Sequence, residues 1–487
     1  MHLSLVRLLL GSTSLLPLLV ASSDRFEYLI AGSNGYDAPC VSPTSESNND
    51  VFITDDGIEY VRTPEEAFVN LTKYGYPYSP NYATVDGMRM HYVDECTSTT
   101  CDDEVILLLH GQPTSSFLYR KMIPILVDRG YRVIAPDWLG FGRSDKPVDL
   151  AEHTYLKQVE RLKSFLRQVV PGVMLEEKPS LTIFVQDWGS LIGLRTVGDE
   201  PDWFRRVVVA NGDLPVPPNN FELFPNPNPV NYNCSDSRSP LEMGLERITS
   251  SPCGFDRTCF QIWMKFALEN PAWMPSEVVI GLATSSKEAA FSMYDVAFPT
   301  RQHMAAPRAF PSMIAAVHEP DFGNGVAREN LKNFSRPFLS LAGERDRNLG
   351  SVATQNGFIN NVIGATVHEF EHRRYPTAGH FIQEDVGEEL AEYVADFIDG
   401  TAHLLEVPST TAAPTAAPTA VPTAVPTLAP TTSAPTVAPV MLPATKAPVA
   451  SVDATKAPVD AALVVGGKKT KKVSKTKKTA TKPSFFG

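Results

Sequence analysis

An aspartate stands where an apolar run of the chain turns abruptly into aromatic and small residues. The run Leu181-Thr182-Ile183-Phe184 is followed by Val185-Gln186-Asp187-Trp188-Gly189-Ser190, which is typical of a buried strand that breaks sharply into a helix. At such a bend Asp187 would point into a site, and its carboxylate, with an ordinary pKa of ~3.9, is charged at neutral pH. A charged carboxylate can displace a leaving group from a saturated carbon and form an alkyl ester. The alternative interpretation is that Asp187 only caps the following helix.

Two further residues that could take part in acid–base chemistry follow predicted strands. Asp346 comes after the apolar run 338–343, and His380 comes after a strand predicted over 367–370. The order nucleophile, acid, histidine is the order of the α/β-hydrolase fold. The sequence therefore predicts an α/β protein of this fold, with a mostly parallel central sheet, helices on both faces and a helical cap domain.

Backbone donors are expected beside the Asp187 carboxylate. The apolar run 105–109 predicts another buried strand, and it leads into a loop that contains Gln112. In this fold the loop after that strand and the residue after the nucleophile supply the N–H groups of an oxyanion hole. We expect these donors to be Gln112 and Trp188. Asp213, just after another predicted strand, is a second position for the acid, although a turn residue is its competing interpretation.

These motifs together resemble those of the haloalkane dehalogenases, specifically the subfamily whose acid follows the seventh strand. The resemblance covers roughly residues 59 to 402. The motifs that carry it, in chain order, are Val61-Arg62-Thr63-Pro64, Tyr78-Ser79-Pro80-Asn81-Tyr82, His110-Gly111-Gln112-Pro113-Thr114-Ser115-Ser116, Gly140-Phe141-Gly142-Arg143-Ser144-Asp145-Lys146-Pro147, Gln186-Asp187-Trp188-Gly189 and Ala378-Gly379-His380-Phe381.

The resemblance implies a hydrolase that converts haloalkanes and water into an alcohol, a halide and a proton. It assigns Asp187 as the nucleophile, His380 as the base that activates water to hydrolyse the ester, and Asp346 as the acid that orients the histidine. It implies a small halogenated hydrocarbon as the substrate and no cofactor. The histidines and cysteines show no metal-ligand spacing.

A departing halide is an anion and needs hydrogen-bond donors in an apolar pocket. The family places a tryptophan directly after the nucleophile, here Trp188. The second donor in the family is either an asparagine, at the position where this chain has Gln112, or a tryptophan of the cap, for which Trp263 is the candidate. The competing interpretation of Trp263 is ordinary helix packing.

Two other functions remain open. An epoxide hydrolase uses the same aspartate, but that family has an aromatic residue where Gln112 stands and takes its acid from paired cap tyrosines, for which this chain offers Tyr294. The other alternative is a non-catalytic, surface-tethered binding protein on a hydrolase scaffold, although Asp187 and His380 are both intact.

Length and composition predict one catalytic domain with extensions. The chain has 487 residues, 43% of them hydrophobic, and a net charge of −12. The predicted segments are a signal peptide (1–23), an N-terminal extension (24–58), the first part of the hydrolase core (59–214), the cap (215–306), the second part of the core (307–402), a disordered Ala/Pro/Thr-rich stalk (403–467) and a basic tail (468–487).

The flanking segments predict a secreted or cell-surface protein. The tail holds eight lysines, which suit an anionic partner such as a cell wall, or serve only solubility. We expect a monomeric core and no nucleic-acid partner. Three glycosylation triplets and six cysteines fit export, with free thiols as the alternative to disulfides. The triplets are at Asn70, Asn233 and Asn333, and the cysteine pairs considered are Cys96 with Cys101, Cys253 with Cys259, and Cys40 with Cys234.

Overall fold

The computed structural model describes residues 51–97, 104–174, 181–215, 267, 276–314 and 324–405. The chain divides into two units, Met1–Ala412 and Ala413–Gly487, and every described residue belongs to the first. The predicted signal peptide, nearly all of the stalk and the basic tail lie outside the described residues, as do Trp263, Asn233 and most of the predicted extension.

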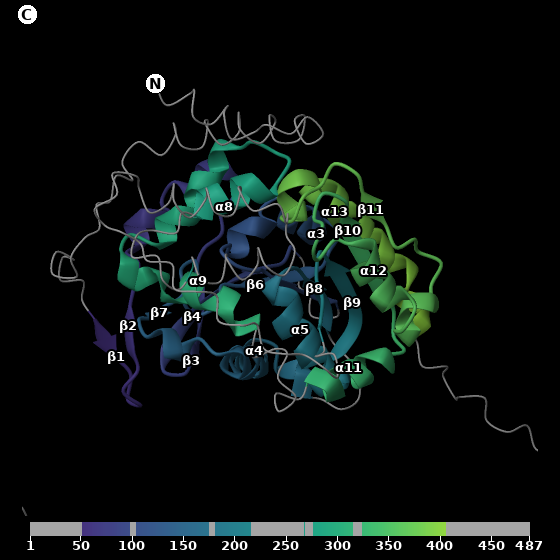
Figure 1. Ribbon diagram of the computed structural model, residues 1–487, viewed down its shortest axis with the longest axis horizontal. Helices are drawn as coiled ribbons and strands as arrows, with labels where there is room; N and C mark the ends of the chain where they lie inside the picture. Colours follow the sequence, from purple (N-terminus) through teal and green to yellow (C-terminus); the bar gives the residue numbers. More distant parts are fainter. Residues whose placement is uncertain are drawn as a thin grey trace, which may run out of the picture. The chain divides into compact units, whose positions relative to one another are not determined.

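An eight-stranded sheet forms the centre of the described part (Figure 1). Its strand order is β11-β10-β9-β8-β5-β6-β4-β3, and it is mostly parallel because only the pairs that include β4 are antiparallel. The strands are β3 (Asn81–Val85), β4 (Met88–Glu95), β5 (Val105–Leu109), β6 (Arg132–Pro136), β8 (Leu181–Val185), β9 (Phe204–Ala210), β10 (Phe338–Gly343) and β11 (Arg374–Tyr375). A second sheet joins β1 (Phe52–Ile53), β2 (Glu59–Val61) and β7 (Lys146–Pro147).

Helices cover both faces of the large sheet. On one face α4 (Tyr155–Val169) and α11 (Asn324–Lys332) both pack against α5 (Trp188–Asp199), and on the other α3 (Ile123–Asp128) packs against α13 (Ile382–Gly400) (Figure 1). The remaining α-helices are α8 (Ser276–Ala283), α9 (Ala305–Ala309) and α12 (Val352–Ile359). The main 3-10 helices are η2 (Glu65–Phe68), η3 (Leu71–Tyr74), η5 (Ser116–Tyr119), η9 (Ala289–Ala297), η10 (Arg301–Met304), η11 (Phe310–Met313) and η13 (Ile363–Thr366).

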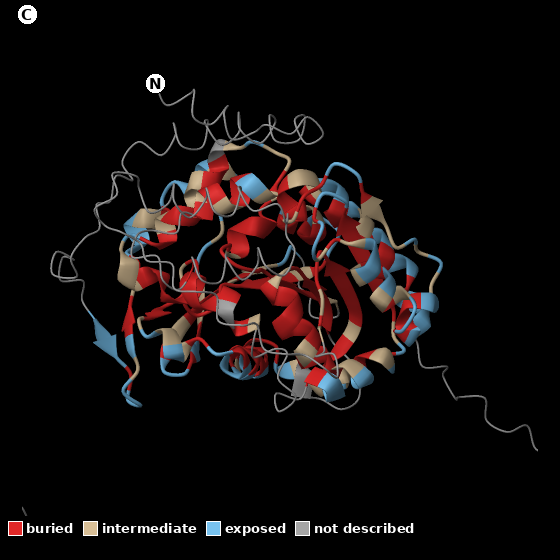
Figure 2. Ribbon diagram, viewed as in Figure 1, coloured by how far each residue is buried: buried red, intermediate tan, exposed pale blue. Residues whose placement is uncertain are grey.

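The central strands are apolar because both of their faces are covered. Every residue of β5, β8 and β10 is buried, and Figure 2 shows the sheet as a buried layer between more exposed helices. Strands covered on both faces read as continuous hydrophobic runs, which is why the sequence places them well. The predicted α/β-hydrolase fold, with its mostly parallel sheet, is confirmed.

The strand expected over 367–370 is wrong. These residues are irregular, and the strand that precedes His380 is β11, only two residues long. The reason is a side chain: His368 Nε2 lies 2.9 Å from the carbonyl oxygen of Phe338, and its ring packs edge-on against Phe397. The segment is therefore held by its histidine, and backbone pairing with β10 begins further along.

Of the predicted cap, the structure describes residues 215, 267 and 276–306. Residues 276–306 include α8, the 3-10 helices η9 and η10, and the first two residues of α9. Among the described residues, no helix combines the length and apolar character needed to cross a membrane. Cys96 is disulfide-bonded, but every other cysteine lies outside the described ranges, so its pairing with Cys101 stays a prediction.

Candidate active site

Asp187 occupies a sharp bend between β8 and α5. Its φ of 49° lies in the left-handed region, where a non-glycine residue is uncommon. Such backbone strain concentrates at functional sites. The next residues must approach other backbone closely, because a Cβ added at Gly189 would lie 2.1 Å from the carbonyl oxygen of Leu109. Although Asp187 stands at the N-cap position, its side chain makes no capping hydrogen bond, so its carboxylate is directed elsewhere.

The carboxylate of Asp187 faces a backbone donor and the histidine. The N–H of Gln112 donates to Asp187 Oδ1 at 2.8 Å, and Oδ2 lies 3.3 Å from Nε2 of His380. On the far side of the ring, Nδ1 of His380 lies 2.8 Å from Oδ2 of Asp346. Asp187 and His380 keep side-chain exposures of 15% and 21%, whereas Asp346 is 5% exposed. The first two can therefore meet a substrate, while Asp346 is screened behind the ring.

The electrostatics of this row favour a charged imidazole. Burial disfavours the protonated ring, but the carboxylates of Asp346 and Asp187 outweigh it and raise the pKa of His380 to about 10. Asp346 is itself held by two backbone N–H groups, from Asn348 at 3.0 Å and Leu349 at 3.1 Å. The two carboxylates therefore hold the ring from both sides and favour its protonated form.

Two predicted halide donors can be located. Trp188 is buried, and its ring meets Phe310 edge-on with centroids 5.7 Å apart. The side-chain Nε2 of Gln112 donates to the carbonyl oxygen of Pro307 at 3.0 Å, while its backbone serves Asp187. Trp263, the third candidate, lies outside the described residues. The oxyanion and halide roles of these residues remain predictions.

Asp213, the second position considered for the acid, binds other partners. Its Oδ1 accepts the N–H of Leu214 at 2.8 Å and lies 3.5 Å from Nη1 of Arg328. Burial raises its pKa. Since Nδ1 of His380 faces Asp346, the geometry favours Asp346 as the acid.

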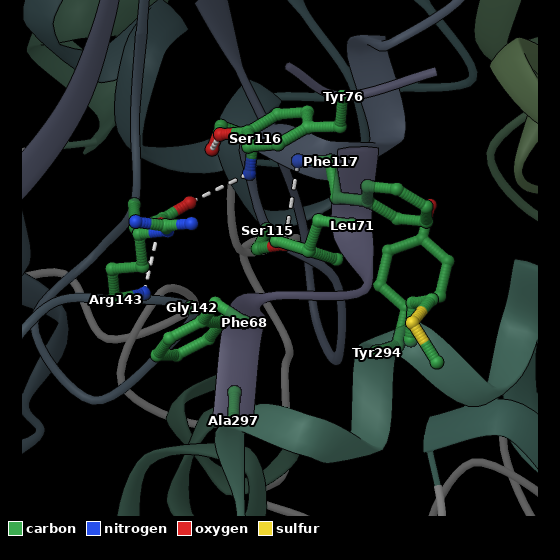
Figure 3. Close-up of a pocket in the computed structure, with 12 residues that line it drawn as sticks. Phe68, Leu71, Tyr76, Ser115, Ser116, Phe117, Gly142, Arg143, Tyr294 and Ala297 are labelled. Atoms are coloured by element: carbon green, nitrogen blue, oxygen red, sulfur yellow. Dashed lines mark hydrogen bonds between the residues drawn. The ribbon is translucent and has the colours of Figure 1, made fainter. Parts of the chain in front are cut away.

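The hydroxyl of Tyr294, considered for epoxide chemistry, donates to Oε1 of the buried Glu384. Its ring lines a cavity together with Tyr76, Phe117 and Arg143 (Figure 3). None of the three residues Asp187, Asp346 and His380 lines this cavity. Tyr294 therefore belongs to a buried polar cluster rather than to the carboxylate site.

The loop that carries His380 is braced in ways that the sequence did not reveal. The N–H of His380 donates to the carbonyl oxygen of Ala283, at the end of α8, at 2.7 Å. Asp385 accepts the N–H groups of Gly379 at 2.7 Å, Ser285 at 2.8 Å and Ser286 at 2.6 Å. Three of these four bonds join groups far apart in the chain, and all four involve backbone groups, so no residue pattern predicts them. Within the described residues, no cluster of three or more His, Cys, Asp or Glu side chains could hold a metal ion.

Comparisons with known proteins agree with this geometry. A family model described as the alpha/beta hydrolase fold matches residues 104–241. A haloalkane dehalogenase of Mycobacterium marinum is 38% identical over 69% of this chain and 99% of its own length, and one of Psychrobacter cryohalolentis is 32% identical over 70% and 98%. The tetrameric haloalkane dehalogenase DpaA of Paraglaciecola agarilytica superposes with a TM-score of 0.53 and 27% identity, covering 69% of this chain and 97% of that structure.

Proposed function

The chain belongs to the haloalkane dehalogenases, α/β hydrolases that act on carbon–halide bonds, and from this membership we propose that it works in two steps through an alkyl ester of Asp187. In the first step an oxygen of the Asp187 carboxylate attacks the carbon that bears the halogen. The new C–O bond forms as the carbon–halogen bond breaks, and the halide leaves with the bonding pair. The observation that carries the proposal is the position of the Asp187 carboxylate. It accepts the N–H of Gln112 at 2.8 Å and makes no capping hydrogen bond to α5.

In the second step water attacks the carbonyl carbon of the ester while Nε2 of His380 accepts a proton from it. The bond from that carbon to the alkyl oxygen then breaks, and the remaining proton of the added water passes to the alkyl oxygen, which gives the alcohol and restores the Asp187 carboxylate. The sum is a haloalkane plus water giving an alcohol, a halide and a proton. Asp346 keeps the ring oriented through the 2.8 Å contact at Nδ1.

The raised pKa of His380 fits this order of steps. The charged carboxylate of Asp187 favours the protonated ring, which makes the imidazole a weaker base before the ester forms. Esterification neutralises Asp187 and removes one of the two carboxylates that stabilise the imidazolium, so the pKa of the ring falls and the ring releases to solvent the proton that the overall reaction yields. The base becomes available only once there is an ester to hydrolyse.

We propose Trp188 as one halide donor, with Gln112 or Trp263 as the second. The family supports a small halogenated hydrocarbon and water as the reactants. Asp213 and Tyr294 need no role in this scheme, since their polar groups are bonded elsewhere. A monomeric state remains a prediction, because the DpaA structure is tetrameric.

We further propose that the chain is exported. The disulfide at Cys96 fits an oxidising compartment. Asn70 and Asn333 are both exposed, as glycan acceptors must be. Treatment of the secreted protein with an N-glycosidase should increase its gel mobility, and a product retained inside the cell with no such shift would contradict export.

The deciding experiment is a single turnover in water labelled with oxygen-18, with excess enzyme over a bromoalkane. The first alcohol should carry unlabelled oxygen taken from Asp187, and the label should enter the Asp187 peptide. Labelled alcohol in the first turnover would instead mean direct attack by water. Asp187→Asn should release no halide, and His380→Gln should release about one halide per enzyme and keep the alkyl group. A diol from styrene oxide with no halide from haloalkanes would indicate an epoxide hydrolase.

A further inference from the structure

The residue after β9, Asn211, touches all three segments that carry the row of catalytic candidates. Its φ is 47°, a left-handed conformation that asparagine tolerates better than most residues. Its backbone carbonyl accepts the N–H of Asp187 at 3.0 Å, and its Oδ1 accepts the N–H of Gly343, the last residue of β10, at 2.8 Å. Its Nδ2 donates to the carbonyl oxygens of Gly379 at 2.7 Å and His380 at 2.9 Å.

These contacts fix the orientation of the Asn211 amide. The oxygen faces an N–H donor and the nitrogen faces two carbonyl acceptors, so exchanging the two atoms would turn three hydrogen bonds into repulsions. The side chain is buried, and these three hydrogen bonds go to backbone groups of Gly343, Gly379 and His380, not to the carboxylate of Asp187. Its side chain therefore acts on the end of β10 and on the loop that carries His380, residues 376–381, which we call the base loop.

The side-chain amide of Gln186 also binds the carbonyl oxygen of His380. Gln186, directly before the nucleophile, is fully buried, and its Nε2 donates to the carbonyl oxygen of His380 at 3.0 Å. The same nitrogen lies 3.3 Å from Nε2 of the imidazole. The carbonyl oxygen of His380 thus accepts hydrogen bonds from Gln186 and Asn211, which follow the adjacent strands β8 and β9.

We infer that Asn211 and Gln186 are positioning residues for the hydrolysis step, because they set the place of the His380 ring over the Asp187 ester through its own carbonyl group. The inference rests on the two-step function proposed above. The attack of Asp187 on the haloalkane uses its carboxylate, the N–H of Gln112 and the proposed halide donors, and not the imidazole of His380. Ester hydrolysis requires a correctly placed imidazole, so loss of either amide slows the second step selectively.

The test uses the full-length enzyme and rapid-quench measurement of bromide released from 1-bromobutane. Asn211→Gly keeps a residue suited to positive φ, and Gln186→Met keeps side-chain length without a donor. In both variants a burst of about one bromide per enzyme should persist, with a rate within about 3-fold of wild type. Steady turnover should fall about 10- to 100-fold, the range expected for a misplaced catalytic group, and alkylated Asp187 should accumulate in mass spectra.

Gln355→Met is the matched control. Gln355 is also buried, and its Nε2 also donates to two backbone carbonyls, those of Ser340 at 3.0 Å and Arg373 at 3.3 Å, away from the base loop. Its loss should lower stability without changing the ratio of burst rate to steady rate. This comparison separates positioning of the base from general support of the fold.

The inference is overturned if Gln186→Met and Asn211→Gly slow the burst and the steady rate in equal proportion, or if turnover stays within about 2-fold of wild type. Should Asn211→Gly fail to fold, Gln186→Met decides alone. His380→Gln run beside them tests the underlying chemistry. If His380→Gln itself gives no burst, the covalent step of the proposed function is wrong. If His380→Gln gives a normal burst but the two amide variants keep the wild-type ratio of burst rate to steady rate, only the positioning role is wrong.

Discussion

Gly111 offers a direct test of whether the observed position of Asp187 is the reactive one. A Cβ added at Gly111 would lie 2.2 Å from Oδ1 and 2.4 Å from Cβ of Asp187. The φ of Gly111 is outside the left-handed region, so alanine is acceptable to the backbone and the penalty is one of space. To reach an ordinary C···O separation of about 3.3 Å, the carboxylate must retreat by about 1 Å. That movement would break its 2.8 Å hydrogen bond from the N–H of Gln112.

Gly111→Ala should therefore slow the first step, the alkylation of Asp187. Asn211→Gly and Gln186→Met are expected to leave this step nearly unchanged. A misplacement of about 1 Å can cost about 100-fold in rate, and overpacking should cost about 1–3 kcal/mol of unfolding free energy. Bromide release before the steady state and urea unfolding measure the two effects. Gly325→Ala is the control, because an added Cβ there meets nothing within 4 Å. A folded Gly111→Ala enzyme with a wild-type burst rate would refute the assignment of this carboxylate position as the attacking one.

Three further results are expected. The pKa of His380 is raised from 6.5 to about 10 in the folded protein, so protonation of the ring stabilises the fold fully below about pH 6.5, and this stabilisation is lost as the pH rises through 10. The unfolding free energy should fall over this window by at most about 1.4 kcal/mol per pH unit. An equal slope in His380→Gln would contradict the raised pKa of this histidine. Glu384→Ala leaves Arg120, paired with it at 2.6 Å and almost fully buried, without its main counter-charge and should cost about 3–5 kcal/mol in urea unfolding, whereas the exposed Glu392→Ala should cost about 1 kcal/mol or less; equal losses would argue against a buried pair. Trp188→Phe keeps an aromatic ring but removes the indole N–H and should lower kcat/KM about 100-fold while weakening inhibition by bromide; an unchanged inhibition constant would exclude Trp188 as a halide donor.

The sequence predicts the parts of the fold that depend on burial. The run 105–109 coincides with β5, because a strand covered on both faces must be continuously apolar. The run 367–370 misled because Val367 lies on the surface at 38% exposure and the actual strand β11 is too short to show a period. A segment held by side-chain contacts, such as the segment around His368, shows no periodic pattern of apolar residues in the sequence.

The candidate site was predictable to the extent that side-chain chemistry marks it. Asp187 and His380 are conspicuous because a carboxylate and an imidazole follow predicted strands, and the structure places them 3.3 Å apart, although their roles stay predictions. Asn211, Gln186 and Asp385 were missed. In the sequence, an amide or carboxylate that binds a backbone group looks like any other polar residue. The two carbonyl groups that accept the Nδ2 of Asn211 lie 168 and 169 positions further along the chain.

The hydrogen bond from His380 to Ala283 has a consequence for engineering. The predicted cap, residues 215–306, is the natural part to exchange between relatives when a new substrate range is wanted, and a boundary drawn by sequence would transplant α8 whole. Ala283 binds the loop that carries His380 through its carbonyl group, whereas the N–H groups of Ser285 and Ser286 bind Asp385, which in turn accepts the N–H of Gly379. A graft can therefore keep Asp187, His380 and Asp346 and still change the position of His380. The interchangeable module should end before α8, and its success should depend on the backbone path of residues 283–286 and on the hydroxyl of Ser285, which donates to the carbonyl oxygen of Thr377.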